Sequence, residues 1–503
     1  MTTIHNQGND LTLSDHWIHD RNWRDQHSIL LRLIIHQQRC LYIDSPYRVF
    51  SALLTLYECV ILALQAVSAV RLALESPFES ASQSNNRLSK RSPVELGGDI
   101  TKCYTIRVNV DGVDLGLQVD STMSDIVVPL SSSNDDIGLT PQHTPSGEPV
   151  TIDYKGDEYK GVTSDTAVTI PGTSITDINL PVVAVEKQSP DLVGIDPEFD
   201  GIFGFGNSLL SKHHPQTTAM DVLYTSDVIP NNEIGLQLCP YEMLSDSFIN
   251  IGNTDVTAKC GTDGTSIAWV QSPLNDEFTV NIKSILINDE PVNLPEEFQK
   301  TIMENGRILY SSVETCFLHM RFPEVVVTAL VDAILDSGAI TVNINIFSDK
   351  LGKVMVKKIF SQNYAMLESG FDIDWGKLPT LSITMFAENP VTDANLNSVV
   401  TIKLGPKDYI QRVDSENCKY LTIAGPNDNA ILGIPFMAQL GLTFDRTHKR
   451  IGFGPGCGCE VATSKYPTIS NGYRVLWPLP RVRLPEQPSG SGSDGTFIRR
   501  RKP

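Results

Sequence analysis

The chain has 503 residues, which is too many for a single hydrophobic core and predicts two or three units of ordinary domain size. Lysine and arginine total 40 against 59 aspartate and glutamate residues, so the formal net charge at pH 7 is -19. This balance argues against nucleic-acid binding and predicts an acidic, soluble surface. A protein that works at acidic pH, where many carboxylates are protonated, would have the same composition.

The first feature along the chain is a long apolar run at residues 49–70, which is typical of the hydrophobic part of a secretory signal. Because 48 mostly polar residues precede it, a type II membrane anchor, an untranslated extension and a buried helix are alternatives. Lys90 and Arg91 then form a dibasic pair that predicts a processing site. Residues 1–91 are therefore expected to be an N-terminal extension with a signal or anchor segment and a propeptide-like region.

Short β-branched runs separated by turn residues follow from Thr101 onward, and they predict a mainly β protein. Strands are expected at 105–110, 125–130, 166–170, 180–185, 278–287, 381–386 and 399–404. Helices are expected at 295–305 and 346–366. The end of the chain, 461–503, becomes rich in glycine and serine and then basic, which predicts a flexible tail.

One pattern occurs twice: an apolar run leads into Asp-Ser, and two apolar residues with a glycine follow much later. Asp120 is followed by Gly204 after 204 - 120 = 84 residues, and Asp336 by Gly433 after 433 - 336 = 97 residues. A single Asp-Ser-Gly is usually only a turn. Two comparable halves, each with an acidic loop at a strand end, would instead bring the loops together at their interface, where a cleft forms.

Six segments in the same order resemble the pepsin-like aspartic proteases (peptidase family A1), between about residues 103 and 459. They are YTIRVNVDGVDLGLQVDS, FDGIFGFG, AILDSG, LPTLSITM, LGPKDYI and AILGIPFMAQLGLTFDRTHKRIGFGP. The resemblance implies an all-β, bilobal fold with two pseudo-twofold-related lobes and a cleft between them. The N-terminal lobe is expected at 92–270 and the C-terminal lobe at 271–460.

The resemblance also implies that Asp120 and Asp336 form a catalytic pair that activates a water molecule to hydrolyse peptide bonds. Like charges at hydrogen-bond distance cannot both ionise, so in this family the two carboxyls share a proton and the enzyme works best in acid. No metal, cofactor or nucleic acid is expected. The expected partner is a peptide or protein substrate, bound by a monomer that is secreted or held in the secretory pathway or a vacuole.

Four further residues are expected to line the substrate site. Tyr154, in IDYKGDEYKGVTSDT, stands where the family has the tyrosine of a β-hairpin flap, although a tyrosine in a hairpin often only packs across strands. Ser121, Ser337 and Gly338 belong to the two expected catalytic loops.

The sequence departs from the family pattern at five supporting positions. Thr122 replaces a glycine and is expected to crowd the loop, Met123 removes a hydroxyl, and Val127 replaces the tryptophan that supports the flap. Ala339 and Ile434 replace polar residues near the second loop. Two hypotheses follow: an active aspartic endopeptidase, or a catalytically impaired homologue that binds peptides or a protein partner.

The chain contains nine cysteines, an odd number. If the chain is secreted, Cys239 with Cys260 is the expected disulfide, and Cys316 with Cys418 is a second candidate. Buried free thiols are the alternative.

Overall fold

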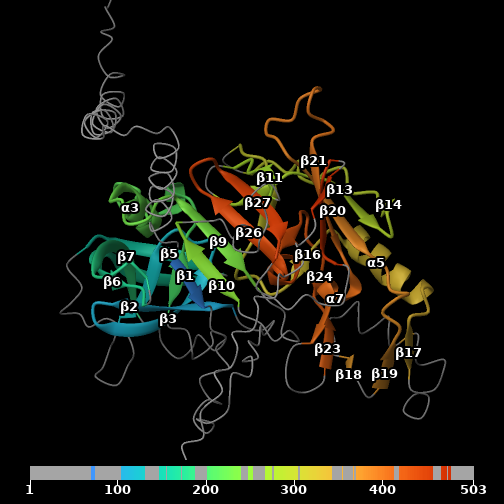
Figure 1. The fold of residues 1–503 in the computed structure, drawn as a ribbon, viewed down its shortest axis with the longest axis horizontal. Coiled ribbons are helices and arrows are strands. Elements are labelled where there is room, and N and C mark those ends of the chain that lie inside the picture. The colour runs from blue at the N-terminus through green and yellow to red at the C-terminus, as the bar shows by residue number, and fades with distance from the viewer. Residues whose placement is uncertain are drawn as a thin grey trace, which may run out of the picture. The chain divides into compact units, whose positions relative to one another are not determined.

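The computed structural model describes residues 70–73, 103–130, 147–154, 156–171, 173–186, 201–238, 247–252, 267–274, 277–303, 306–342, 354, 366–367, 370–412, 418–456, 466–472 and 474–476. All of them lie in the unit Ala69–Pro503. Strands far outnumber helices in this part of the chain, so the prediction of an all-β fold is confirmed (Figure 1).

The first lobe is a seven-stranded sheet with the order β2-β3-β8-β4-β7-β6-β5, in which β2 also pairs with β6. Its strands are β2 (Thr105–Val110), β3 (Val113–Asp120), β4 (Ile126–Leu130), β5 (Pro149–Tyr154), β6 (Asp157–Thr169), β7 (Ile178–Glu186) and β8 (Ile202–Gly204). β2 and β3 form a hairpin because Asp111 and Gly112 both have positive φ, at 50° and 85°, as a tight two-residue turn requires.

The second lobe holds a five-stranded sheet, β12-β15-β25-β16-β24, and a six-stranded sheet, β14-β13-β20-β21-β28-β29. The first comprises β12 (Thr279–Val280), β15 (Ser311–Val313), β16 (Met320–Arg321), β24 (Ile423–Ala424) and β25 (Ile431–Leu432). The second comprises β13 (Ile282–Ile287), β14 (Glu290–Pro291), β20 (Leu381–Phe386), β21 (Val399–Leu404), β28 (Thr468–Asn471) and β29 (Arg474–Leu476). Two small sheets complete it: β17 (Ile340–Val342) with β19 (Phe371–Ile373), and β18 (Met366–Leu367) with β23 (Cys418–Leu421) and β22 (Ile410–Arg412).

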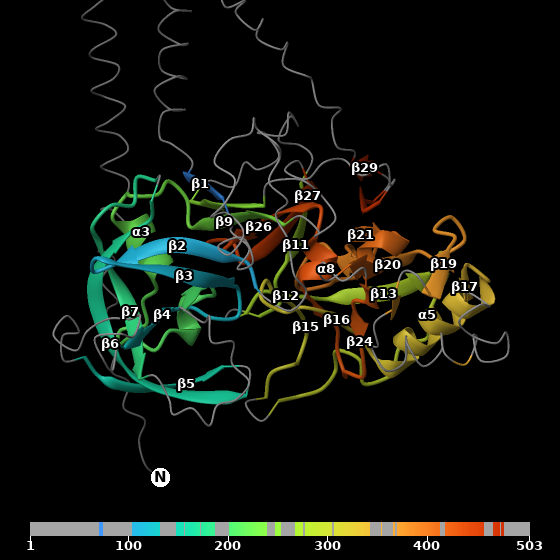
Figure 2. The ribbon, with the colours of Figure 1, turned by 90° about the horizontal axis from the view of Figure 1, so that it is seen from below.

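A six-stranded sheet with the order β1-β10-β9-β26-β27-β11 lies between the two lobes (Figures 1 and 2). Its strands come from distant parts of the chain: β1 (Val70–Ala73), β9 (Glu233–Gln237), β10 (Phe248–Ile251), β11 (Ala268–Gln271), β26 (Leu440–Asp445) and β27 (Arg450–Pro455). The antiparallel pairing of β9 with β26 joins the end of the first lobe to the end of the second.

The described helices are few: η2 (Ser208–Leu210), α3 (Ala219–Thr225), α5 (Glu324–Asp336), α7 (Pro406–Tyr409) and α8 (Ile434–Met437). α5 is the longest. It buries Val326, Leu330, Val331 and Ile334, a spacing that places one apolar face of the helix against the lobe. The helix ends at Asp336, and Gly338, two residues later, has a φ of 59°, a left-handed conformation that suits glycine and commonly follows the end of a helix.

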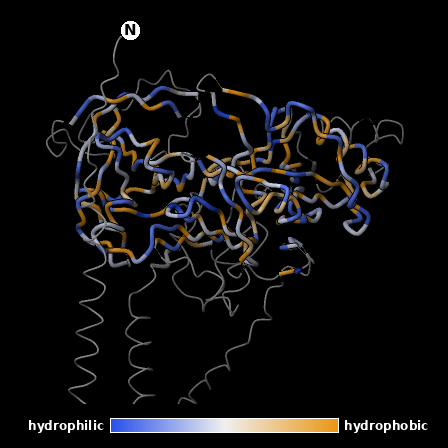
Figure 3. The backbone as a smooth tube through the Cα atoms, turned by 90° about the horizontal axis from the view of Figure 1, so that it is seen from above, coloured by the Kyte–Doolittle hydropathy of each residue, from blue (hydrophilic) through white to orange (hydrophobic). Residues whose placement is uncertain are grey.

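Apolar side chains form one large core that runs through both lobes and the sheet between them. In β2 and β3, buried and more exposed residues alternate, which is the two-residue period of a half-buried strand. Hydrophobic and hydrophilic residues are interspersed along the backbone (Figure 3). Phe205, Phe278 and Phe444 meet where the lobes join, with ring centroids 4.9–6.1 Å apart. The apolar core is therefore shared between the two lobes where they join.

Three sequence predictions are corrected or left open here. The predicted helix at 295–305 is wrong in its described part, because residues 296–300 form turns and Ile302 makes a bridge to Ile308. Most of the predicted helix at 346–366 and residues 49–69 of the predicted signal or anchor lie outside the described residues. Within the described ranges, no helix combines the length and the apolar character needed to cross a membrane.

Candidate active site

Asp120 ends strand β3 in the middle of the first lobe, and its side chain is buried. β3 runs parallel to β8, with Asp120 opposite Gly204. The loop after Asp120 then crosses β8, because the carbonyl groups of Met123 and Asp125 accept hydrogen bonds from the N–H groups of Gly206 and Gly204. A Cβ atom on Gly204 would collide with these same carbonyl oxygens, so the crossing requires glycine.

The second lobe repeats this arrangement around Glu314. β15 runs parallel to β25, and the N–H of Glu314 donates to the carbonyl of the last residue of β25 (3.0 Å). The loop after Glu314 crosses Gly433, where an added Cβ would collide with the carbonyl oxygens of Phe317 and His319. Glu314 therefore occupies in the second lobe the position that Asp120 occupies in the first.

The two loops correspond residue by residue with a constant offset. Glu314 follows Asp120 by 314 - 120 = 194 residues, and the carbonyls that cross the two glycines are separated by the same 194 positions (317 - 123 and 319 - 125). A constant offset over matching contacts is what a pseudo-twofold axis between the loops requires.

Four buried hydrogen bonds hold the loops together. The N–H of Ser121 donates to Oγ1 of Thr315 (2.9 Å), and the N–H of Thr315 donates to Oγ of Ser121 (3.1 Å). The Ser121 hydroxyl then donates to the carbonyl of Val313 (3.0 Å), and the Thr315 hydroxyl donates to the carbonyl of Val119 (2.9 Å). Because every bond has its mirror 194 residues away, Asp120 and Glu314 are held as a symmetric pair.

The structure does not bring Asp336 to Asp120, so the predicted pairing is wrong on this point. Asp336 is the last residue of α5 and is exposed, and this helix lies on the side of the second lobe away from β3 in both views (Figures 1 and 2). Ser337 donates to a carbonyl of the helix (2.6 Å), and Gly338 ends it. The Asp-Ser-Gly segment is thus a helix terminus, and its serine and glycine do not belong to the site.

Three hydrogen-bond donors surround the carboxylate of Asp120. The N–H and the hydroxyl of Thr122 donate to Oδ1 (2.8 and 2.7 Å), and the hydroxyl of Tyr154 donates to Oδ2 (2.5 Å). The expectation that Thr122 damages the loop is therefore corrected, since its N–H reaches the carboxylate and its hydroxyl adds a second donor. Burial, and then the negative charge of Asp120, raise the pKa of Tyr154, so its phenol stays protonated.

The pseudo-twofold arrangement of the two loops makes Glu314 the counterpart of Asp120. The negative charge of Glu314 is also among the causes that raise the pKa of Tyr154. The hydroxyl of Ser312 donates to Oε1 of Glu314 (2.6 Å). Glu314 was not predicted from the sequence because Glu314-Thr315-Cys316 does not match the Asp-Ser-Gly pattern that is present at Asp336.

Tyr154 reaches the site from the hairpin formed by β5 and β6. The turn passes through Gly156, whose φ is 93°. Tyr154 packs in a small apolar cluster with Val127 and Ile152, and Met123 lies against it. Valine thus contributes apolar support beneath the hairpin at the position where a tryptophan was expected.

A disulfide between Cys103 and Cys316 lies next to the acidic pair, with the Cα atoms 4.9 Å apart. Cys316 is the second residue after Glu314. Cys103 lies two residues before the start of β2 in the first lobe. The predicted pairing of Cys316 with Cys418 is therefore wrong. Cys239 and Cys260 lie outside the described residues.

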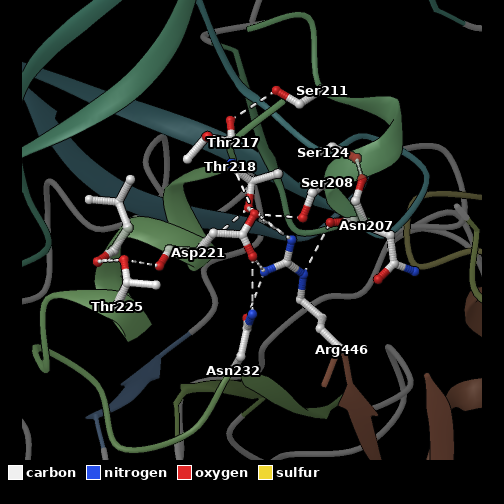
Figure 4. Close-up of polar contacts among 12 residues, drawn as sticks. Ser124, Asn207, Ser208, Ser211, Thr217, Thr218, Asp221, Thr225, Asn232 and Arg446 are labelled. Carbon is white, nitrogen blue, oxygen red and sulfur yellow. Dashed lines mark hydrogen bonds and ion pairs between the residues drawn. The ribbon is translucent and has the colours of Figure 1, made fainter. Parts of the chain in front are cut away.

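An ion pair between the buried Arg446 and the half-buried Asp221 lies beside Gly206, which contacts the first loop (Figure 4). Arg446 follows β26 and contacts Asp221 of α3 (2.9 Å), while it donates to Thr218 (2.8 Å) and to the carbonyl of Gly206 (3.1 Å). Burial alone would raise the pKa of Asp221, but the charge of Arg446 and hydrogen bonds from Ser208 and Thr218 outweigh it and lower the pKa to about 2.

No cluster of three or more His, Cys, Asp or Glu side chains suited to a metal ion occurs among the residues that the structure describes. Asp120 and Glu314 supply two carboxyl groups from symmetry-related loops, and carboxyl groups are suited to general acid–base hydrolysis.

In a comparison with protein families, the model described as "Eukaryotic aspartyl protease" matches residues 140–456, well over half of the chain. The matched range includes Glu314 and begins after Asp120.

Proposed function

The chain belongs to the eukaryotic aspartyl protease family, and on this premise we propose that it is an endopeptidase whose acidic pair is Asp120 and Glu314. The observation that supports this proposal is the set of reciprocal hydrogen bonds between Ser121 and Thr315, which holds the two acidic loops as a symmetric pair. Members of this family act on peptides and proteins, so the substrate class is peptide bonds.

We assign the base to Asp120 and the acid to Glu314. Three donors point at the carboxyl group of Asp120, an arrangement that suits an ionised acceptor. In pepsin-like aspartic proteases the two carboxyls share one proton, because like charges this close cannot both ionise. Asp120 takes a proton from water as the water attacks the carbonyl carbon, and Glu314 donates its proton to the carbonyl oxygen.

Tyr154 has two roles in this proposal. In this structure its hydroxyl donates a hydrogen bond to Oδ2 of Asp120, so the hairpin must move before water and substrate can reach that oxygen. When the hairpin closes over a bound peptide, the apolar cluster beneath it excludes bulk water and strengthens the hydrogen bonds inside the site.

The test is digestion of a denatured protein between about pH 3 and 6, with and without pepstatin, using the full processed chain. General acid–base groups contribute roughly 10²–10⁴-fold, so Asp120→Asn and Glu314→Gln should each lower kcat/KM by about that factor. Asp336→Asn is the matched control and should keep full activity. Loss of activity in Asp336→Asn, or normal activity in Glu314→Gln, would refute the assignment of Glu314.

A second candidate function is peptide binding without turnover. Two observations favour it: Tyr154 occupies the carboxylate of Asp120, and Glu314 stands where the family has aspartate. Glu314→Asp separates the two functions, because it restores the family residue without changing the charge. Binding of pepstatin by calorimetry with no cleavage in the native protein, and cleavage in Glu314→Asp, would identify a binding protein.

The remaining features fit a secreted or vacuolar protein, as is typical of this family, acting as a monomer. We propose that residues 1–91 form an extension that is removed after Arg91, and that 92–270 and 271–460 form most of the two lobes. The expected tail at 461–503 is wrong in part, because residues 468–471 and 474–476 form β28 and β29 in the six-stranded sheet of the second lobe. N-terminal sequencing of the protein secreted by its host would test the cleavage site: a start at residue 92 is expected, and any other start would contradict it.

A further inference from the structure

The disulfide between Cys103 and Cys316 joins the first lobe to the loop that carries Glu314. The carbonyl of Tyr104 accepts a hydrogen bond from the N–H of Val119 (3.0 Å), so Cys103 lies across from the end of β3, where Asp120 stands. The bond spans 213 residues of sequence. It therefore connects the immediate surroundings of both acidic residues.

The twofold offset gives Cys316 a counterpart, since 316 - 194 = 122. Thr122 stands two positions after Asp120, and Cys316 stands two positions after Glu314. Each is attached to a residue of the first lobe, Thr122 to Asp120 and Cys316 to Cys103. Thr122 is held by hydrogen bonds to Asp120, whereas Cys316 is held by a covalent bond to Cys103. Of these two attachments, only the second can be broken by a reductant.

Tyr154 covers this disulfide. Its oxygen lies 3.6 Å from Sγ of Cys316 and 2.5 Å from Oδ2 of Asp120. Both cysteines are only 3 % exposed. Because exchange requires a thiolate to reach a sulfur atom of the disulfide, a soluble reductant needs this hairpin to move first.

We propose that the Cys103–Cys316 disulfide is a reduction site for soluble dithiols, opened by movement of Tyr154, and that its reduction loosens the loop of Glu314 from the first lobe. One thiolate of the dithiol attacks one sulfur and displaces the other. The second thiol of the reductant then releases the protein from the mixed disulfide. The products are two cysteine thiols and the cyclic disulfide of the reductant, with two electrons and two protons transferred to the protein.

The first experiment measures how fast the disulfide is reduced. The full, oxidised chain is treated with dithiothreitol, and free Cys103 and Cys316 are alkylated and quantified by peptide mass spectrometry. A hydrogen bond to a charged group holds Tyr154 in place, so Tyr154→Ala should be reduced about tenfold faster or more. Tyr224→Ala, which truncates an exposed tyrosine of α3, is the control and should match the wild type. Equal rates in all three proteins would overturn the proposed route.

The second experiment measures the consequence of reduction by amide hydrogen exchange in the native protein. Reduction should accelerate exchange in peptides that cover 311–317 by about tenfold, because one of the attachments of this loop is lost, while peptides of α5 should not change. In Cys103→Ser the fast exchange should be present without reductant and should not respond to it. Unchanged exchange in the reduced wild-type protein refutes the proposal, whether or not the variant folds.

The proposal concerns the site of the proposed function but does not depend on catalysis. Both experiments read thiols or amide protons and need no substrate turnover. If digestion fails while reduction changes exchange at 311–317, the peptidase assignment is refuted and the reduction site stands. If digestion succeeds and exchange does not change, the opposite holds.

Discussion

Asp408 allows a quantitative prediction of how stability depends on pH. This residue of α7 is fully enclosed, and it accepts hydrogen bonds from the N–H of Gly405 (2.7 Å) and from Nε2 of Gln439 (3.0 Å). Burial disfavours the charged carboxylate more than the N–H of Gly405 favours it, and this raises the pKa of Asp408 from 3.8 to about 7.

The sign and size of the effect follow from this pKa. Between pH 3.8 and 7 the folded protein holds a proton that the unfolded chain has lost, so the free energy of unfolding falls as the pH rises. The shift is 7 - 3.8 = 3.2 units. At about 1.4 kcal/mol per unit, the loss is about 1 kcal/mol by pH 4.5 and about 4 kcal/mol above pH 7.

The assay is urea denaturation of the wild type and of Asp408→Asn at pH 4.5, 6 and 7.5. Asparagine is similar in shape and stays neutral, so the variant should gain stability over the wild type as the pH rises, by about 3 kcal/mol between pH 4.5 and 7.5. Asp393→Asn, at an exposed aspartate, is the control and should follow the wild type. If Asp408→Asn keeps the pH dependence of the wild type, Asp408 is ionised in the folded protein and the reasoning is wrong.

Three further predictions concern the scaffold. Arg446→Met should cost about 1.5–3 kcal/mol of unfolding free energy, because it removes hydrogen bonds to the charged, half-buried Asp221, and Arg446→Met with Asp221→Leu should cost less; equal losses in urea denaturation would contradict this. Since the pKa of Asp221 is lowered to about 2, its stabilising effect should be lost as the pH falls from about 4 to 2, and acid titration of Asp221→Asn should lack this transition. Gly204→Ala should destabilise the protein by several times more than Gly112→Ala, measured by thermal unfolding, because only the former meets backbone atoms.

The fold could be predicted from the sequence to a large extent because its signals are local. Alternating apolar residues and turn residues predicted the strands, and the repeated pattern of two apolar residues with a glycine singled out Gly204 and Gly433, where the structure shows the crossings. The prediction that was wrong is the pairing of Asp336 with Asp120 as the second catalytic residue. The residues before it have helical spacing, with Val326, Leu330 and Ile334 on one face, and this spacing already predicts a helix rather than a strand that leads into a catalytic loop.

Glu314 was hidden for a different reason. Its segment, SSVETCF, lacks both the aspartate and the glycine by which the loop is usually found. Only long-range pairing identifies it: β15 beside β25, and Thr315 bonded to Ser121 across 194 residues. Such contacts leave no local pattern in the chain, so they became visible only in three dimensions.

The hydrogen bonds between Ser121 and Thr315 also bear on how such a site evolves. The residues that fix the geometry stand beside the acids and are distinct from them, because neither Asp120 nor Glu314 contributes a side chain to the four bonds. A change of acid at position 314 therefore leaves this framework intact. Substitution of either acid can therefore change the proton chemistry of the site without removing the hydrogen bonds that hold the two loops together.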